Sequence, residues 1–127
     1  MRLVIGGAWQ GKRDWVIRHW AVDPSLVIDG AECQEEALKD GAAVDHFHLL
    51  VRRWMIAGED AVMKTEAMLR ENPDIIVISD EIGCGIVPVD KEERDYRELH
   101  GRICCQLAMQ ADEVVRVCCG IGQCIKP

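Results

Sequence analysis

The segment Leu3-Val4-Ile5-Gly6-Gly7-Ala8-Trp9-Gln10-Gly11-Lys12-Arg13 decides the fold. Its apolar beginning is typical of a short buried strand, and the two glycines that follow it indicate a turn. From Lys12 to Ala21 the apolar side chains recur at helical spacing. The segment therefore predicts a strand, a glycine-rich turn and a helix in direct succession.

The same alternation continues along the chain. Further apolar runs predict strands at residues 26–29, 75–78 and 114–118, with a short fifth strand at 123–126. Periodic patterns predict helices at residues 44–55, 59–70 and 90–110. Strands that are apolar throughout and alternate with helices are buried on both faces. We therefore expect an α/β fold, with a mostly parallel sheet and helices on both faces.

Length and composition limit the classes of protein that need to be considered. The chain has 127 residues, of which 49% are hydrophobic and 29% charged, so we expect one domain covering residues 1–127. The apolar runs are too short for a membrane span or a signal peptide, which favours a cytoplasmic protein with no membrane partner. The net charge of −7 argues against general binding of nucleic acid. Any anion must be bound by a specific loop.

The glycine-rich turn supplies such a loop. Its residues fit the pattern G-x-x-x-x-G-K between a strand and a helix, in which backbone N–H groups and the lysine ammonium surround a phosphate. The alternative is a glycine-rich turn that only caps the helix. The predicted nucleotide-binding residues are Gly6, Gly7, Ala8, Trp9, Gln10, Gly11, Lys12 and Arg13.

The eighth position of this pattern is unusual. Ser or Thr normally stands there and binds Mg²⁺ through its hydroxyl group, whereas this chain has Arg13. An arginine is no ligand for a cation. Either Arg13 neutralises phosphate charge in place of part of the metal, or it points to solvent and metal-dependent chemistry is lost.

Asp29 is the candidate magnesium residue. It ends the apolar run at residues 26–28, as a Walker B aspartate does. The competing role for an aspartate before a glycine is to cap a turn or a helix.

The second half of the chain carries a family resemblance. The stretch Ile78-Ser79-Asp80-Glu81-Ile82-Gly83-Cys84-Gly85-Ile86-Val87-Pro88 resembles the N-E-V-G-x-G-I-V-P loop of the bifunctional adenosylcobinamide kinase/adenosylcobinamide-phosphate guanylyltransferase family. Arg94-Asp95-Tyr96-Arg97-Glu98 and Ala111-Asp112-Glu113-Val114 keep the register of that family. The resemblance implies a P-loop NTPase-like fold and a homotrimer. It also implies phosphoryl transfer from ATP or GTP, with Mg²⁺, to a corrinoid hydroxyl group, followed by transfer of GMP through a histidine.

By position, the resemblance assigns roles to a few residues. Lys12 and Glu81 would be catalytic, and Glu81, Gly83 and Gly85 would line the substrate side. The carboxyl end of a strand, where α/β sheets bind ligands, is the place for such residues.

The chain also departs from the family. Asp80 stands where the family has Asn, and the block that carries the guanylylated histidine, before the Walker B strand, is missing. We therefore expect guanylyl transfer to be lost. Two hypotheses remain: a nucleotide-binding kinase of this type, or a non-catalytic paralogue that binds a nucleotide or a corrinoid.

Three further features have open interpretations. Trp9 either stacks on a ligand or packs over the following helix. His46 and His48 fall in a predicted helix, where they are expected at the surface. The seven cysteines are read as small buried hydrophobic residues, with a metal or redox site as the alternative.

Overall fold

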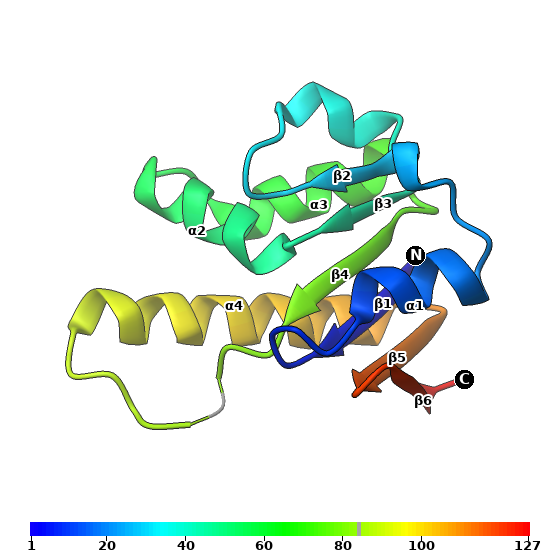
Figure 1. The fold of residues 1–127 in the computed structure, drawn as a ribbon. Coiled ribbons are helices and arrows are strands. Elements are labelled where there is room, and N and C mark those ends of the chain that lie inside the picture. Colours follow the sequence, from blue (N-terminus) through cyan, green and yellow to red (C-terminus); the bar gives the residue numbers. More distant parts are fainter. Residues whose placement is uncertain (84) are drawn as a thin grey trace.

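A six-stranded sheet in the order β2-β3-β4-β1-β5-β6 forms the centre of the protein (Figure 1). The computed structural model describes residues 1–83 and 85–127, so Cys84 lies outside the described residues. The strands are β1 (Arg2–Gly6), β2 (Val27–Asp29), β3 (Ala43–Asp45), β4 (Ile76–Asp80), β5 (Glu113–Cys118) and β6 (Ile121–Lys126). Every described pairing is parallel except that of β5 with β6. The predicted α/β fold with a mostly parallel sheet is confirmed.

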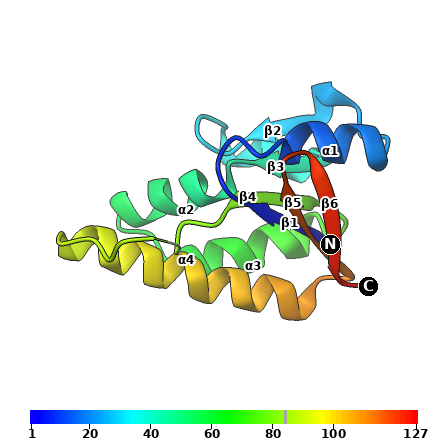
Figure 2. The same ribbon diagram turned by 60° about the horizontal axis from the view of Figure 1, so that its bottom comes forward.

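Helices cover both faces of this sheet. The helices are α1 (Lys12–His19), α2 (Phe47–Ile56), α3 (Ala61–Glu71) and α4 (Lys91–Gln110), with short 3₁₀ turns η1 (Pro24–Leu26) and η2 (Glu35–Lys39). Figure 2 shows α1 on one side of the sheet and α2, α3 and α4 on the other. In the described residues, no helix is both long and apolar enough to cross a membrane.

Alternate side chains of the strands enter two separate cores. Leu3 packs among residues of α2, α3 and α4, whereas its neighbour Val4 packs with Val16 of α1. In β4, Val77 faces the first core and Ile76 the second. Because successive side chains of a strand point to opposite faces, burial on both faces requires an uninterrupted apolar sequence.

The pairing of β1 with β4 positions the candidate site. In the parallel register, Gly6 at the end of β1 is the partner of Asp80 at the end of β4. The backbone N–H of Glu81 donates to the Gly6 carbonyl over 2.9 Å. The polar residues after both strands are therefore brought together at one edge of the sheet, beside the start of the glycine-rich turn.

The predicted helix at residues 44–55 is wrong at its beginning. Residues 43–45 form strand β3, and His46 separates it from α2, which begins at Phe47. A strand of three residues in front of a helix leaves an apolar spacing that also fits one longer helix. The missed strand matters because β3 lies between β2 and β4, which makes β2 an edge strand.

Candidate functional site

The glycine loop (residues 6–13) connects β1 to α1 by a tight turn. Gly11 precedes α1 with a φ of 87°, and Trp9 has a φ of 62°. A non-glycine residue in the left-handed region has a conformational free energy that is higher by about 1–2 kcal/mol. Gly11 therefore adopts this conformation without strain, whereas Trp9 is strained. The Trp15 N–H donates to the Gly11 carbonyl over 2.9 Å and continues the hydrogen bonding of the helix.

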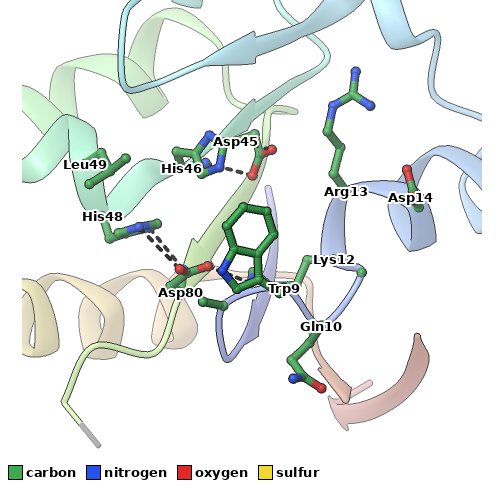
Figure 3. A pocket seen from close by; sticks show the side chains of 12 residues that line it. Trp9, Gln10, Lys12, Arg13, Asp14, Asp45, His46, His48, Leu49 and Asp80 are labelled. Atoms are coloured by element: carbon green, nitrogen blue, oxygen red, sulfur yellow. Dashed lines mark hydrogen bonds and ion pairs between the residues drawn. The ribbon is translucent and has the colours of Figure 1, made fainter. Parts of the chain in front are cut away.

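A cavity of about 360 Å³ opens beside this loop (Figure 3). Its walls come from the glycine loop, the start of α1, the ends of β3 and β4, and the start of α2. The lining residues are Ala8, Trp9, Gln10, Gly11, Lys12, Arg13, Asp14, Asp45, His46, His48, Leu49 and Asp80. Six of the eight predicted nucleotide-binding residues line the cavity, and Gly6 and Gly7 lie outside its lining.

Lys12 lies under the loop and is almost fully buried. Only 7% of its surface is exposed. Its Nζ donates to the Gly7 carbonyl over 2.7 Å and is 2.6 Å from Asp80 Oδ1. A buried ammonium group requires such partners, because removing it from water without them is costly. Among the described residues, the carboxylate that contacts Lys12 is that of Asp80, at the end of β4.

Asp80 is held in turn by His48. The Asp80 backbone N–H donates to His48 Nδ1 over 3.2 Å, and His48 Nε2 is 3.4 Å from Asp80 Oδ2. Since Nδ1 accepts a hydrogen bond from the backbone N–H, the neutral ring carries its hydrogen on Nε2, which faces the carboxylate. Burial lowers the pKa of His48 below its usual value, which favours this neutral form. The expectation that His48 is a surface residue was wrong.

The end of β3 supplies a second carboxylate to the cavity wall. Asp45 is buried, and its Oδ1 accepts the backbone N–H of His46 over 2.8 Å. No periodic signal pointed to Asp45, because it was read as part of a helix. Asp45 is the last residue of β3, which lies next to β4, so its carboxylate and that of Asp80 both line the cavity.

Asp29, the predicted magnesium residue, lies outside the residues that line the cavity. It ends the edge strand β2, and its Oδ1 accepts from the Ala31 N–H over 3.0 Å and is 2.9 Å from His46 Nδ1. Partial burial acts to raise the pKa of Asp29, but the hydrogen bonds from Ala31 and His46 outweigh it and lower the pKa overall. Asp29 therefore contacts the cavity through His46, which does line it.

The predicted residues of the second loop lie apart from the cavity. Glu81 forms an ion pair with Arg116 of β5 over 3.2 Å. Gly85 has a φ of 98°, a conformation that favours glycine, and a Cβ at Gly83 would meet no atom within 4 Å. Neither Glu81 nor these glycines are among the residues that line the cavity beside Lys12.

Two side chains of the glycine loop are open to solvent. Trp9 is 99% exposed, so the interpretation that it packs over the following helix was wrong. Arg13 is also exposed, and Figure 3 shows its side chain directed away from Lys12 and Asp80. Arg13 also lines the cavity, so both interpretations of this residue stay predictions.

A buried polar cluster behind the site was missed. His100 Nε2 is 2.8 Å from Ser79 Oγ, and Cys104 Sγ is 3.4 Å from the same nitrogen. Burial lowers the pKa of His100 to about 4 and raises that of Cys104 to about 12. The sequence could have predicted the burial of His100, because this residue falls on the apolar stripe of α4 with Tyr96 and Ile103.

The comparison with protein families matches most of the chain. The model of the cobinamide kinase/cobinamide phosphate guanyltransferase family matches residues 12–125. The chain belongs to this family. The resemblance inferred from the loop after β4 and from α4 is thereby confirmed.

Curated relatives in this cobinamide kinase family match over a shorter segment. The bifunctional adenosylcobalamin biosynthesis protein CobU of Salmonella typhimurium is 42% identical over 52 residues, which are 41% of this chain and 29% of the relative. CobU of Escherichia coli has the same identity and coverage. The matched part is thus less than a third of either relative's length.

The cysteines of this family member are less buried than expected. Among the described residues, Cys33 and Cys104 are partly buried and Cys105, Cys118, Cys119 and Cys124 are exposed. The description as small buried residues was wrong for these four. Cys118, Cys119 and Cys124 belong to the edge hairpin of β5 and β6, and Cys105 lies on the solvent-facing side of α4. No group of three or more potential metal ligands occurs within the described part of the chain.

Proposed function

We propose that this family member binds a nucleoside triphosphate, ATP or GTP, at the glycine loop. One observation carries the proposal: a cavity that joins the strand–loop–helix turn and Lys12 to the carboxylates at the ends of β3 and β4. The N-terminus of α1 and the backbone N–H groups of the loop favour an anion at this position. Parallel α/β sheets bind their ligands at the carboxyl ends of the strands.

The proposed reaction is phosphoryl transfer from the nucleotide to the hydroxyl group of a cobinamide-type corrinoid. Lys12 would bind the transferred phosphate, and its charge would stabilise the negative charge that develops on it. Trp9 and Leu49 at the cavity wall offer apolar surface to an acceptor. Glu81, Gly83 and Gly85 remain candidates for binding the acceptor substrate, and Glu81 contacts Arg116 of β5.

The carboxylates that line the cavity are suitable ligands for Mg²⁺. Mg²⁺ prefers oxygen ligands and is bound in such sites by one or two carboxylates together with phosphate oxygens. Asp45 fits that role, and Asp29 would act through His46. When bound, Mg²⁺ would neutralise part of the phosphate charge.

A second function has specific support. A non-catalytic paralogue that binds a nucleotide or a corrinoid would retain the loop and lose the transfer step. Arg13 in place of Ser or Thr favours this alternative, since the eighth residue offers no oxygen to the cation. We further propose a cytoplasmic homo-oligomer that lacks guanylyl transfer.

Calorimetry and a transfer assay test both functions. ATP and GTP, each with and without Mg²⁺, are titrated into the wild type and into Lys12→Met as the control. Transfer from γ-labelled ATP or GTP to cobinamide is then measured for the wild type and Arg13→Ser. Kinase activity is expected in both, and higher in Arg13→Ser. Binding without transfer in either would favour the non-catalytic paralogue, and absence of nucleotide binding would refute both functions.

A further inference from the structure

The ion pair between Lys12 and Asp80 places a carboxylate where a ligand phosphate is needed. Lys12 Nζ is 2.6 Å from Asp80 Oδ1 and is shielded from water, with 7% of the residue exposed. The ammonium group has three hydrogens, and one of them is already used by the Gly7 carbonyl. An anion that enters the cavity therefore meets a lysine whose charge is already neutralised.

Asp80 is held in this position by more than Lys12. Its backbone is fixed by the register of β4 with β1, in which Asp80 is the partner of Gly6. His48 Nδ1 accepts the Asp80 N–H over 3.2 Å, and Nε2 of the same ring is 3.4 Å from Asp80 Oδ2. When Oδ1 loses Lys12, the His48 ring still lies beside Oδ2. The carboxylate thus remains inside the site after a ligand has displaced it from the lysine.

We propose that Asp80 is a specificity-determining residue, because a ligand phosphate must displace its carboxylate from Lys12. This inference rests on the proposed nucleotide function and goes beyond it, since it predicts which anions the loop accepts. A tethered carboxylate competes at a high effective concentration. A single phosphate replaces one anion by another with little gain, whereas a triphosphate adds contacts with the loop backbone and the start of α1.

The chain provides a matched control for this effect. Asp14 also lines the cavity, but it is exposed and lies on the first turn of α1. Asp80→Asn and Asp14→Asn change the net charge equally, and only the first removes a partner of Lys12. Asp80→Asn also introduces the residue that the family resemblance has at this position. General electrostatics predicts similar effects for both variants, whereas displacement predicts an effect of Asp80→Asn alone.

The test is calorimetric binding of ATP, GTP and inorganic phosphate to the wild type, Asp80→Asn and Asp14→Asn. Loss of a charge-assisted hydrogen bond typically changes an equilibrium constant by about tenfold or more. We expect Asp80→Asn to bind the triphosphates about tenfold more tightly and to bind inorganic phosphate measurably. Asp14→Asn should change the affinity by about twofold or less, because an exposed charge is screened.

A double-mutant cycle makes the assignment specific to Lys12. In the Lys12→Met background, Asp80→Asn is expected to give no gain in affinity. The four proteins of the cycle are the wild type, Lys12→Met, Asp80→Asn and the double variant, and they are also unfolded in urea without ligand. A coupling of about tenfold in the unfolding equilibrium constant would verify the ion pair in solution. Lack of coupling would overturn the proposal.

Two results separate failure of this inference from failure of the proposed function. If the wild type binds ATP or GTP and Asp80→Asn gains no more than Asp14→Asn, Asp80 does not control access to Lys12 and the inference is overturned. If no protein of the series binds a triphosphate, the nucleotide function itself is refuted and the inference falls with it.

Discussion

His100 Nε2 and Ser79 Oγ form a hydrogen bond of 2.8 Å inside the protein, one residue before the carboxylate that neutralises Lys12. Both residues are nearly inaccessible to water, with 4% and 1% of their surface exposed. The Ser79 hydroxyl is also 3.2 Å from the Asp80 carbonyl. This bond connects α4 to the end of β4, so the position of Asp80 depends on an uncharged histidine.

The pH dependence of stability follows from this histidine. Burial lowers the pKa of His100 from 6.5 to about 4 in the folded protein. Between these two values the unfolded chain binds a proton that the folded chain does not, so stability falls as the pH falls. The loss at low pH amounts to roughly 3 kcal/mol at 1.36 kcal/mol per pKa unit. Urea unfolding from pH 7 to pH 4 measures it.

His100→Gln provides the control for this prediction. Removal of the titrating group should reduce the pH dependence over the same range, whatever the stability of the variant at pH 7. The lowered pKa of His48 contributes a dependence of the same sign that this variant retains. An equal slope for both proteins would show that His100 titrates normally in the folded state.

Trp9 is predicted to report ligand binding. It is 99% exposed at the cavity rim, whereas Trp15, Trp20 and Trp54 are partly or fully buried. Stacking on a base or another planar group contributes about 1–3 kcal/mol, so Trp9→Ala should weaken nucleotide or corrinoid binding by about tenfold. In the wild type, the ligand should protect part of the fluorescence from acrylamide. Trp9→Phe, which keeps a ring, should bind nearly as well, and unchanged affinity in Trp9→Ala would exclude stacking.

Gly122 is predicted to tolerate no side chain. A Cβ on this residue of β6 would overlap the indole ring of Trp15. Overpacking of this kind costs about 1–3 kcal/mol, so Gly122→Ala should lower the free energy of unfolding by that amount. Gly101 of α4 has no atom within 4 Å of a Cβ, and Gly101→Ala should stabilise the protein by about 0.5–1 kcal/mol. Thermal unfolding of the two variants should show shifts of opposite sign; a similar shift in both would contradict this packing.

Asn72 is predicted to stabilise the end of α3. Its Nδ2 donates to the carbonyls of Leu38 over 2.9 Å and Gly41 over 2.8 Å, which connects the helix to the segment before β3. Asn72→Ala leaves these carbonyls without their donor and should cost about 1–3 kcal/mol in urea unfolding. Glu66→Ala, on the exposed side of the same helix, should change stability by about 0.5 kcal/mol or less. Equal effects of the two substitutions would show that the Asn72 contacts contribute nothing.

The sequence predicted the parts of the fold that have strong local patterns. The apolar runs of β1 and β4 are bounded by glycine, proline or aspartate, and α4 has a long periodic stripe, so all three were found. Strand β3 was missed because three residues give no period of their own. The sheet order depends on contacts between distant segments, which local patterns do not encode.

The site was predicted in part for the same reason. The glycine loop is continuous in sequence and was recognised from its spacing. His48 and Asp45 enter the cavity only because β3 lies next to β4, so the missed strand concealed both. Asp29 was chosen because it ends an apolar run, and its position on an edge strand follows only from the sheet order.

The contact of Gln10 with the turn after β5 has a practical consequence. The Cys119 N–H donates to Gln10 Oε1 over 2.7 Å, and the Gly120 N–H donates to the Gln10 carbonyl over 2.8 Å. The hairpin of β5 and β6 therefore supports the loop proposed to bind phosphate. A substitution in the turn between β5 and β6 would therefore act directly on that loop, although the turn lies 109 residues away along the chain.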